Sequence, residues 1–242
     1  MILGKNLMSV TIESLKDLYK LSNNNQITKV VWWPNEKLIN LPDNLHTLEI
    51  MLDFDQKLEN IPNNLHTLNM RRSIFNRKSE NLPINLHTFI VGTIFNQKLE
   101  NLPPTLHTLQ FGSMFNQKLE NLPPTLHTLK LCESFNQKLE NLPLNLHTLQ
   151  LGHDFNQKLE NLPPNLHTLQ LGYCFNQSLD DLPPGLHKLK IHINNKNIDY
   201  DYLQDIYKLD TTEKDLYKIM NIKGRKGMFT KSSNKKHFLC MP

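Results

Sequence analysis

The sequence has few cysteines and no long apolar run. Its 242 residues contain three cysteines, Cys132, Cys174 and Cys240, which are too few and too far apart for a disulfide framework or a CxxC metal site. The longest apolar cluster, VVWW at residues 30–33, is too short to cross a membrane, and the first residues do not resemble a signal peptide. These absences predict an intracellular, cytoplasmic protein without membrane contact.

Catalytic motifs are also missing. The chain contains no GxGxxG, GxSxG, HExxH or Walker sequence. The carboxylates that recur, such as Glu100 and Glu120, belong to a repeated row, whereas catalysis needs a few groups that converge in one cleft. We therefore expect no enzymatic activity, no cofactor, and no catalytic, cofactor-binding or metal-ligating residues.

Acidic residues are missing from the end of the chain. The last 21 residues contain Lys and Arg but no acid, although the net charge of the whole chain is only +4 at pH 7. Their basic residues are Lys223, Arg225, Lys226, Lys231, Lys235 and Lys236. The rest of the chain therefore lacks the broad basic surface that phosphate binding needs. We predict a basic, flexible tail at residues 222–242.

Repetition is what the sequence has in abundance. The string FNQKLENLP begins unchanged at Phe95, Phe115, Phe135 and Phe155. LHT or LHK recurs at the same spacing, and the period is 20 residues across 34–193, with one extra residue between Phe54 and Phe75. A fixed period this short predicts a solenoid, in which each repeat is one coil stacked on its neighbours.

Each unit has the apolar pattern of one coil. The apolar positions of residues 106–125 include Leu106, Leu109, Phe111, Phe115, Leu119 and Leu122. The first three have the LxxLxL spacing of a short strand of about five residues, and the others follow on a return path from which paired prolines exclude a helix. We predict a mainly β, leucine-rich-repeat-like right-handed solenoid with about nine short parallel strands and helical caps at both ends.

The chain divides into four predicted segments. Residues 1–33 form an N-terminal helical cap and a degenerate first coil, 34–193 the 20-residue repeats, 194–221 a C-terminal helical cap and 222–242 the basic tail. Helical spacing in Ile12–Leu21, Ile198–Leu209 and Thr212–Met220 predicts the cap helices. The first strand, near Ile27, comes 18 residues before the second, and Pro34 takes the Phe position.

The FNQ string followed by Leu-Pro resembles the FNIP-repeat family, which is of the leucine-rich-repeat type and occurs in social amoebae and in giant viruses of amoebae. The resemblance covers roughly residues 34–193. The chain departs from the family pattern in having Lys, as at Lys98, where Pro commonly follows FNQ, and in its shorter period. The resemblance implies no catalytic activity, and it implies the host cytoplasm if the protein is viral. Some members carry an F-box, but the region before Ile27 contains no convincing one.

Two polar files run along the repeats. The histidine file consists of His46, His66, His87, His107, His127, His147, His167 and His187. A metal needs ligands that converge on one point, so we expect these residues to hydrogen-bond backbone or a neighbouring coil instead. The asparagine file consists of Asn76, Asn96, Asn116, Asn136, Asn156 and Asn176, with Asp55 in one coil. We expect its amides to bond free backbone groups at a turn.

Two charged rows accompany these files. They consist of Lys98, Lys118, Lys138 and Lys158, and of Glu100, Glu120, Glu140 and Glu160. Opposite charges in adjacent rows offset the repulsion within each row, and an exposed pair contributes only about 0–1 kcal/mol. We interpret the rows as a solvated edge, with a polymer-binding surface as the alternative.

The repeats differ most at outward positions of the strands, and solenoids commonly bind partners on this concave face. We predict that another protein binds there. The predicted partner-binding residues are Glu49, Asn69, Arg71, Arg72, Gln110, Lys130, Glu133, Gln150, His153, Gln170, Tyr173 and Lys190. Arg and Tyr are enriched in binding hot spots, which favours Arg71 with Arg72, and Tyr173 with His153, as anchors. A plain sheet surface without a partner is the alternative.

Two other functions stay open. The chain would be a substrate-recognition adaptor of a ubiquitin ligase if its N-terminal cap recruits the ligase. The basic tail would contact nucleic acid, an acidic protein or anionic lipid, although it has one aromatic residue before His237, Phe229, and no RNA-binding motif. We favour a monomer that binds an unidentified protein, with nucleic-acid binding less favoured.

Overall fold

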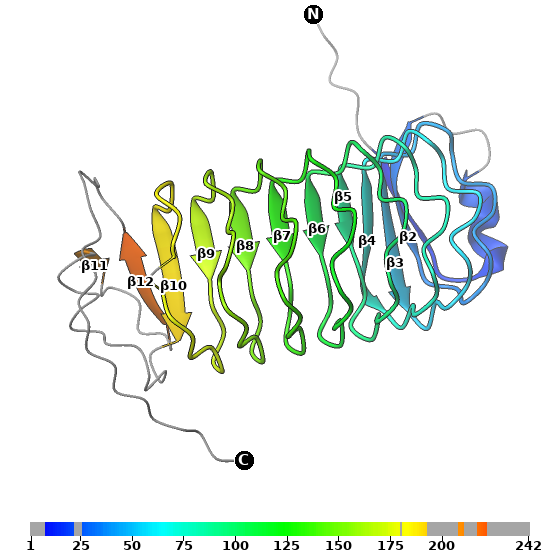
Figure 1. The fold of residues 1–242 in the computed structure, drawn as a ribbon. Helices are drawn as coiled ribbons and strands as arrows, with labels where there is room; N and C mark the ends of the chain where they lie inside the picture. The colour runs from blue at the N-terminus through cyan, green and yellow to red at the C-terminus, as the bar shows by residue number, and fades with distance from the viewer. Residues whose placement is uncertain (1–7, 22–25, 180, 193–207, 211–216, 222–242) are drawn as a thin grey trace, which may run out of the picture.

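The computed structural model describes residues 8–21, 26–179, 181–192, 208–210 and 217–221, and it forms a solenoid of stacked coils (Figure 1). One 12-stranded sheet runs along the solenoid in the order β1-β2-β3-β4-β5-β6-β7-β8-β9-β10-β12-β11. The parallel strands are β1 (Met8–Ile12), β2 (Ile27–Trp32), β3 (Thr47–Leu52), β4 (Thr67–Ser73), β5 (Thr88–Ile90), β6 (Thr108–Gln110), β7 (Thr128–Lys130), β8 (Thr148–Gln150), β9 (Thr168–Gln170) and β10 (Lys188–His192). The predicted mainly β parallel solenoid is confirmed, and the predicted strands are β2–β10.

The single extra residue of the repeat array lies in β4. Pairing between β3 and β4 changes from Glu49 opposite Asn69 to Met51 opposite Arg72, so β4 has one more residue at this point. A β-bulge absorbs such a residue without disturbing the rest of the ladder. The 20-residue register then returns, with Thr88 opposite Thr108. Arg72 therefore pairs with Met51. Without the extra residue, counting from Thr47 opposite Thr67 would place Arg72 opposite Leu52.

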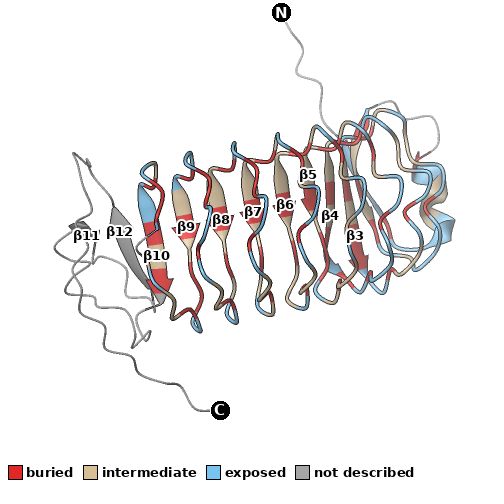
Figure 2. Ribbon diagram, viewed as in Figure 1, coloured by how far each residue is buried: buried red, intermediate tan, exposed pale blue. Residues whose placement is uncertain are grey.

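The core is a set of apolar rows that run the length of the solenoid (Figure 2). In the coil of β6, Leu106, Leu109, Phe111 and Phe115 are buried. Each Phe that begins a return segment stacks on the next, as Phe115 does on Phe135 with ring centroids 6.1 Å apart. A fully buried Phe contributes about 1.5–3 kcal/mol, but only when a neighbouring coil covers it. The stack therefore makes each coil dependent on its neighbours.

The central strands are shorter than the five residues expected, and a glycine lies two residues after the end of β5, β6, β8 and β9. Strands β5 to β9 have 3 residues each, whereas β3 has 6 and β4 has 7. A Cβ added to Gly112 would lie 2.1 Å from the carbonyl oxygen of Gly92 in the preceding coil. Adjacent backbones approach too closely here for a side chain, which explains glycine at Gly92, Gly112, Gly152 and Gly172.

The helix predicted for Ile12–Leu21 at the N-terminal end is not confirmed. Ile12 ends strand β1, which pairs with β2, and a 3₁₀-helix, η1 (Leu15–Leu21), follows. The Asp17 carboxylate accepts hydrogen bonds from the backbone N–H of Glu13 and Ser14. It also pairs with Lys20 Nζ at 2.7 Å, three residues away, which suits the tighter 3₁₀ turn.

The predicted helices at the C-terminal end are wrong where the structure describes this region. β12 (Tyr217–Asn221) is a strand antiparallel to β10, and β11 (Lys208–Asp210) pairs with β12. The last parallel strand of a solenoid exposes unpaired N–H and C=O groups, and an added strand pairs them. Residues 193–207 and 211–216, the rest of the predicted helices, and the predicted tail at 222–242 lie outside the described residues.

Asparagines hold the return segments together in two ways. The asparagine of each Asn-Leu-Pro or Asn-Ile-Pro step, from Asn40 to Asn161, has a positive φ of 53–62°, a left-handed conformation that Asn tolerates better than most residues. In the asparagine file, the side-chain oxygen of each member accepts the backbone N–H of the next, as Asn96 Oδ1 does from Asn116 N at 3.0 Å. The expected backbone role of this file is confirmed.

Candidate partner-binding site on the strand face

The outward side chains of the central strands form two parallel rows. In each of β5 to β9 the middle residue is buried and the residues on either side are half-buried. One row is threonine from Thr88 to Thr168, and the other is Ile90, Gln110, Lys130, Gln150 and Gln170. Because parallel pairing sets equivalent residues opposite each other, these side chains stand at the spacing of the strands. We call this surface the strand face.

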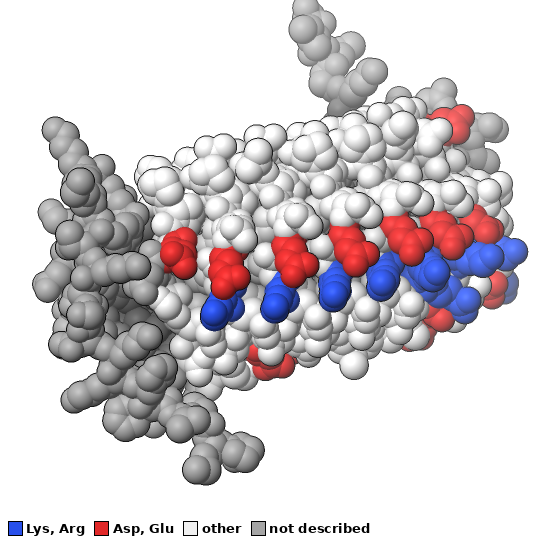
Figure 3. All heavy atoms as spheres, in the orientation of Figure 1, with Lys and Arg blue, Asp and Glu red and all other residues white. Residues whose placement is uncertain are grey.

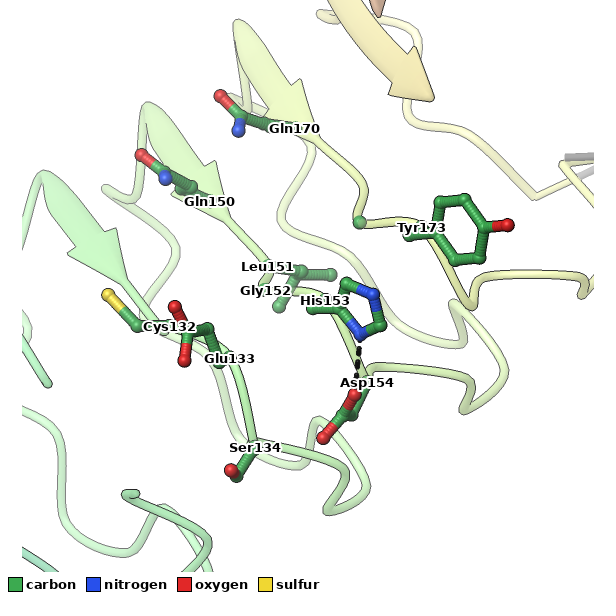
Figure 4. A pocket seen from close by; sticks show the side chains of 11 residues that line it. Cys132, Glu133, Ser134, Gln150, Leu151, Gly152, His153, Asp154, Gln170 and Tyr173 are labelled. Carbon is green, nitrogen blue, oxygen red and sulfur yellow. Dashed lines mark hydrogen bonds and ion pairs between the residues drawn. The ribbon is translucent and has the colours of Figure 1, made fainter. Parts of the chain in front are cut away.

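A hollow of about 690 Å³ lies where the strand face meets the segments after β7, β8 and β9 (Figure 4). Its lining includes five predicted partner-binding residues: Glu133, Gln150, His153, Gln170 and Tyr173. The structure thus brings together residues from three successive coils that are up to 40 positions apart in the chain. We call this place the β7–β9 hollow. Its volume lies within the range of about 300–1,000 Å³ that ligand pockets commonly have.

The aromatic side of the β7–β9 hollow is preorganised. The rings of His153 and Tyr173 are stacked, with centroids 5.2 Å apart and planes at 6° (Figure 4). His153 Nδ1 lies 2.6 Å from Asp154 Oδ1. A backbone hydrogen bond links the two segments that carry these residues, because Cys174 N–H donates to the His153 carbonyl at 2.9 Å. Tyr173 remains 46% exposed, so the pair presents an aromatic surface to the solvent.

A second, smaller hollow of about 290 Å³ lies over β3 and β4 and includes Glu49, Asn69, Arg71 and Arg72 in its lining. The bulge in β4 places Arg71 beside the strand rows, where its Nη2 donates to Gln110 Oε1 at 3.0 Å, two coils away. Glu49 accepts from Lys29 Nζ at 2.9 Å. The predicted pair Arg71 with Arg72 is therefore partly engaged in contacts within the chain.

Three predicted residues, Gln110, Lys130 and Lys190, line neither hollow, and Gln110 is the acceptor of the Arg71 side chain. Lys130 belongs to the strand row on β7, and Lys190 lies in β10. Conversely, Cys132, Ser134 and Asp154 line the β7–β9 hollow but are not among the predicted partner-binding residues. Asp154 stands where other coils have Met114 or Ser134, so comparison of the repeats one position further along would have found it.

Cys132 occupies the repeat position that is glycine in the neighbouring coils, and it lines the β7–β9 hollow. Burial raises the pKa of its thiol, and the nearby Glu133 carboxylate raises it further. Nucleophilic cysteines have a lowered pKa, so this thiol lacks the activation that covalent catalysis uses.

The histidine file has a structural role. In His87, His107, His127, His147, His167 and His187, Nδ1 lies 2.6–2.7 Å from the carbonyl oxygen two residues earlier. A carbonyl only accepts, so Nδ1 carries the proton and donates it. Successive rings stack, as His107 does on His127 at 5.1 Å. The predicted backbone hydrogen bond is confirmed for these six residues, while His66 Nδ1 is buried without a hydrogen-bond partner.

The charged rows lie on the return segments, where blue and red side chains run side by side along the coils (Figure 3). Lys158 Nζ is 3.7 Å from Glu160 Oε1, and both side chains are largely exposed. Exposed pairs of this kind contribute between about 0 and 1 kcal/mol. The rows therefore add little stability. Within the described residues, no helix is long and apolar enough to span a membrane.

Comparison with known proteins identifies the repeats. The family model FNIP Repeat matches residues 95–134 and again residues 135–174. The resemblance to the FNIP-repeat family is thereby confirmed at residues 95–174, which match the family model. No curated protein matches the chain. A similar solved structure is YopM from Yersinia enterocolitica WA-314, which is 23% identical over 69% of this chain and 50% of that chain, with a TM-score of 0.40.

Proposed function

We propose that this FNIP-repeat solenoid is a non-enzymatic scaffold that binds another protein on its strand face, with the β7–β9 hollow at the centre of the contact. The observation that carries the proposal is the convergence of Glu133, Gln150, His153, Gln170 and Tyr173 in that hollow. These residues stand where the repeats differ, whereas the residues that hold the coils together are nearly the same in every repeat. Variation at a shared, preformed surface is what partner recognition requires.

The chemistry of the hollow suggests the kind of partner. Gln150 and Gln170 offer amide donors and acceptors, Glu133 offers a carboxylate, and the stacked His153–Tyr173 pair offers an aromatic surface. Such a lining suits a protein loop that places one apolar or aromatic side chain against the ring pair and polar groups against the amides. A stable interface buries about 800 Å² on each partner, so the contact has to extend beyond the hollow along the strand rows.

The rigid scaffold reduces the conformational entropy that is lost on binding. Backbone hydrogen bonds link every coil to the next, as Thr128 N–H does to the His107 carbonyl at 2.9 Å. Side chains on such a frame lose less conformational freedom on binding than side chains on a mobile loop. This supports recognition by display of side chains rather than by a conformational change.

A capture experiment with two matched variants tests the proposal. The first variant removes hollow side chains (Gln150→Ala, Gln170→Ala and Tyr173→Ala), and the control removes the same number from the charged rows (Lys118→Ala, Glu120→Ala and Lys138→Ala). From a lysate of the cells that make the protein, we expect one partner to bind the wild-type chain and the control but not the hollow variant. Equal capture by all three baits would contradict binding at the hollow.

The alternatives rest on the ends of the chain. A ubiquitin-ligase adaptor predicts that ligase subunits co-purify with the chain and are lost when residues 1–26 are deleted. Nucleic-acid binding predicts steeply salt-sensitive association that disappears when residues 222–242 are deleted. Neither has support from a contact among the described residues, so binding on the strand face remains our proposal.

A further inference from the structure

Three side chains with metal-binding atoms meet at the edge of the β7–β9 hollow. His153 and Asp154 follow strand β8, and Cys174 occupies the position equivalent to Asp154 in the next coil. Their ligand atoms, His153 Nδ1, a carboxylate oxygen of Asp154 and Cys174 Sγ, all lie within 4.8 Å of one another. His153 Nδ1 is 2.6 Å from Asp154 Oδ1 and 3.7 Å from Cys174 Sγ.

The geometry separates two uses of this residue set. A Cys-His-Asp catalytic triad needs the thiol at one ring nitrogen and the carboxylate at the other, so that the imidazole can pass a proton between them. Here the thiol and the carboxylate both approach the same nitrogen, Nδ1 of His153. A proton relay through the ring is therefore impossible in this arrangement. A metal ion, in contrast to a catalytic triad, requires donor atoms that surround one point, as these three do.

We propose that His153 Nδ1, Asp154 Oδ1 and Cys174 Sγ form a binding site for Zn²⁺. Ideal bond lengths of about 2.0–2.3 Å place neighbouring ligand atoms of a tetrahedral zinc about 3.3–3.6 Å apart. The distance between Nδ1 and Sγ is already close to this value at 3.7 Å. The hydrogen-bonded atoms Nδ1 and Oδ1 are 2.6 Å apart, and this distance has to increase by less than about 1 Å.

The donor set selects the class of metal. One thiolate, one imidazole and one carboxylate suit zinc and similar divalent transition ions, whereas Mg²⁺ and Ca²⁺ prefer oxygen ligands alone. Three protein ligands leave the fourth tetrahedral position to water or to a group of a bound partner. The site therefore goes beyond the proposed function and does not depend on it.

Neighbouring contacts preorganise the ligands. Stacking on Tyr173 orients the His153 ring, and the backbone bond from Cys174 N–H to the His153 carbonyl holds the two coils together. Burial, with a smaller contribution from the Asp154 carboxylate, raises the pKa of the Cys174 thiol. A metal binds the thiolate, so its binding displaces a proton from Cys174, and the affinity should rise with pH.

Titration of the full-length chain with Co²⁺, a spectroscopic substitute for Zn²⁺, tests the site. We expect a thiolate-to-cobalt charge-transfer band at one equivalent, which added Zn²⁺ abolishes and added Mg²⁺ does not. A Cys132→Ser/Cys240→Ser variant keeps Cys174 as its single cysteine, and it should keep the band. Cys174→Ser should lose the band.

Calorimetric titration with Zn²⁺ tests His153 as a ligand and tests Cys174 a second time. Cys174→Ser and His153→Gln should each weaken binding at least about tenfold. The matched control His167→Gln removes a histidine of the file, and it should bind Zn²⁺ as the wild type does. Circular dichroism confirms that each variant is folded. Absence of a band in the wild-type chain, or a band that persists in Cys174→Ser, would overturn the proposal.

Discussion

The return segments and the strand face use their side chains for opposite purposes. On the return segments, asparagine and proline positions recur almost unchanged, and the amide of Asn96 bonds the backbone of the next coil. On the strand face, the position of Gln110 is Ile90 in one neighbouring coil and Lys130 in the other. A side chain that satisfies backbone groups is difficult to replace, whereas one that faces solvent is free to change. The difference indicates that the return segments stabilise the stack of coils, and it leaves the strand face free for the recognition that we propose.

One glycine on the strand side is an exception, because it is required for stability. Its substitution has the largest expected effect on the free energy of unfolding. Gly112→Ala would place Cβ 2.1 Å from the Gly92 oxygen and 2.6 Å from Thr93 Cα, both backbone atoms. We expect a loss of about 3 kcal/mol in the free energy of unfolding, measured by urea denaturation. Cys132→Ala is the control, because this equivalent position already has a Cβ, and it should cost less than about 1 kcal/mol. Equal stability of both variants would refute the close approach.

Removing one member of the asparagine file tests the return segments directly. Asn116→Ala deletes the acceptor of the Asn136 backbone N–H at 3.0 Å and of the Gln137 side chain at 3.1 Å. The unpaired groups should cost about 2 kcal/mol in the free energy of unfolding, again measured in urea. Asn116→Asp keeps an acceptor, as Asp55 does naturally for Asn76 N–H, and should recover most of this loss. A loss as large as that of alanine would contradict the acceptor role.

Substitution of an asparagine with a positive φ should have a smaller effect on the free energy of unfolding. Asn121 has a φ of 53°, so Asn121→Ala should lose about 1 kcal/mol because alanine tolerates this conformation less well. Asn121→Gly should be as stable as the wild type or nearly so, because glycine has no Cβ to clash. Thermal denaturation of the three proteins distinguishes the cases. Similar melting temperatures for the alanine and glycine variants would show that backbone conformation is not the reason for asparagine here.

A strand-face substitution gives the smallest effect on folding. Gln150→Ala removes a half-buried side chain that lines the β7–β9 hollow, and it should change the free energy of unfolding by less than about 0.5 kcal/mol. The same substitution should weaken partner capture, since its amide is part of the proposed contact. A loss of stability comparable to that of Asn116→Ala would remove the distinction between the two regions.

The sequence predicted the fold better than it predicted the ends. The period and the LxxLxL spacing predicted β2–β10, and every residue of that pattern in the coil of β6 is buried. Tyr217–Asn221 has an apolar pattern short enough to suit a helix or a strand. It forms a strand because β10 presents an unpaired edge, which only the assembled sheet creates. Of the twelve predicted partner-binding residues, nine line one of the two hollows.

The sequence by itself determined the coil, because a 20-residue period with fixed apolar, asparagine and proline positions allows one way to bury the leucines. It did not determine which variable residues meet. Asp154 and Cys174 are separated by 20 residues, and they share one point because adjacent coils stack in register. Such contacts depend on distances between coils, and those distances are set by packing and backbone hydrogen bonds rather than by any local pattern. Tertiary structure alone therefore decided which of the variable residues meet.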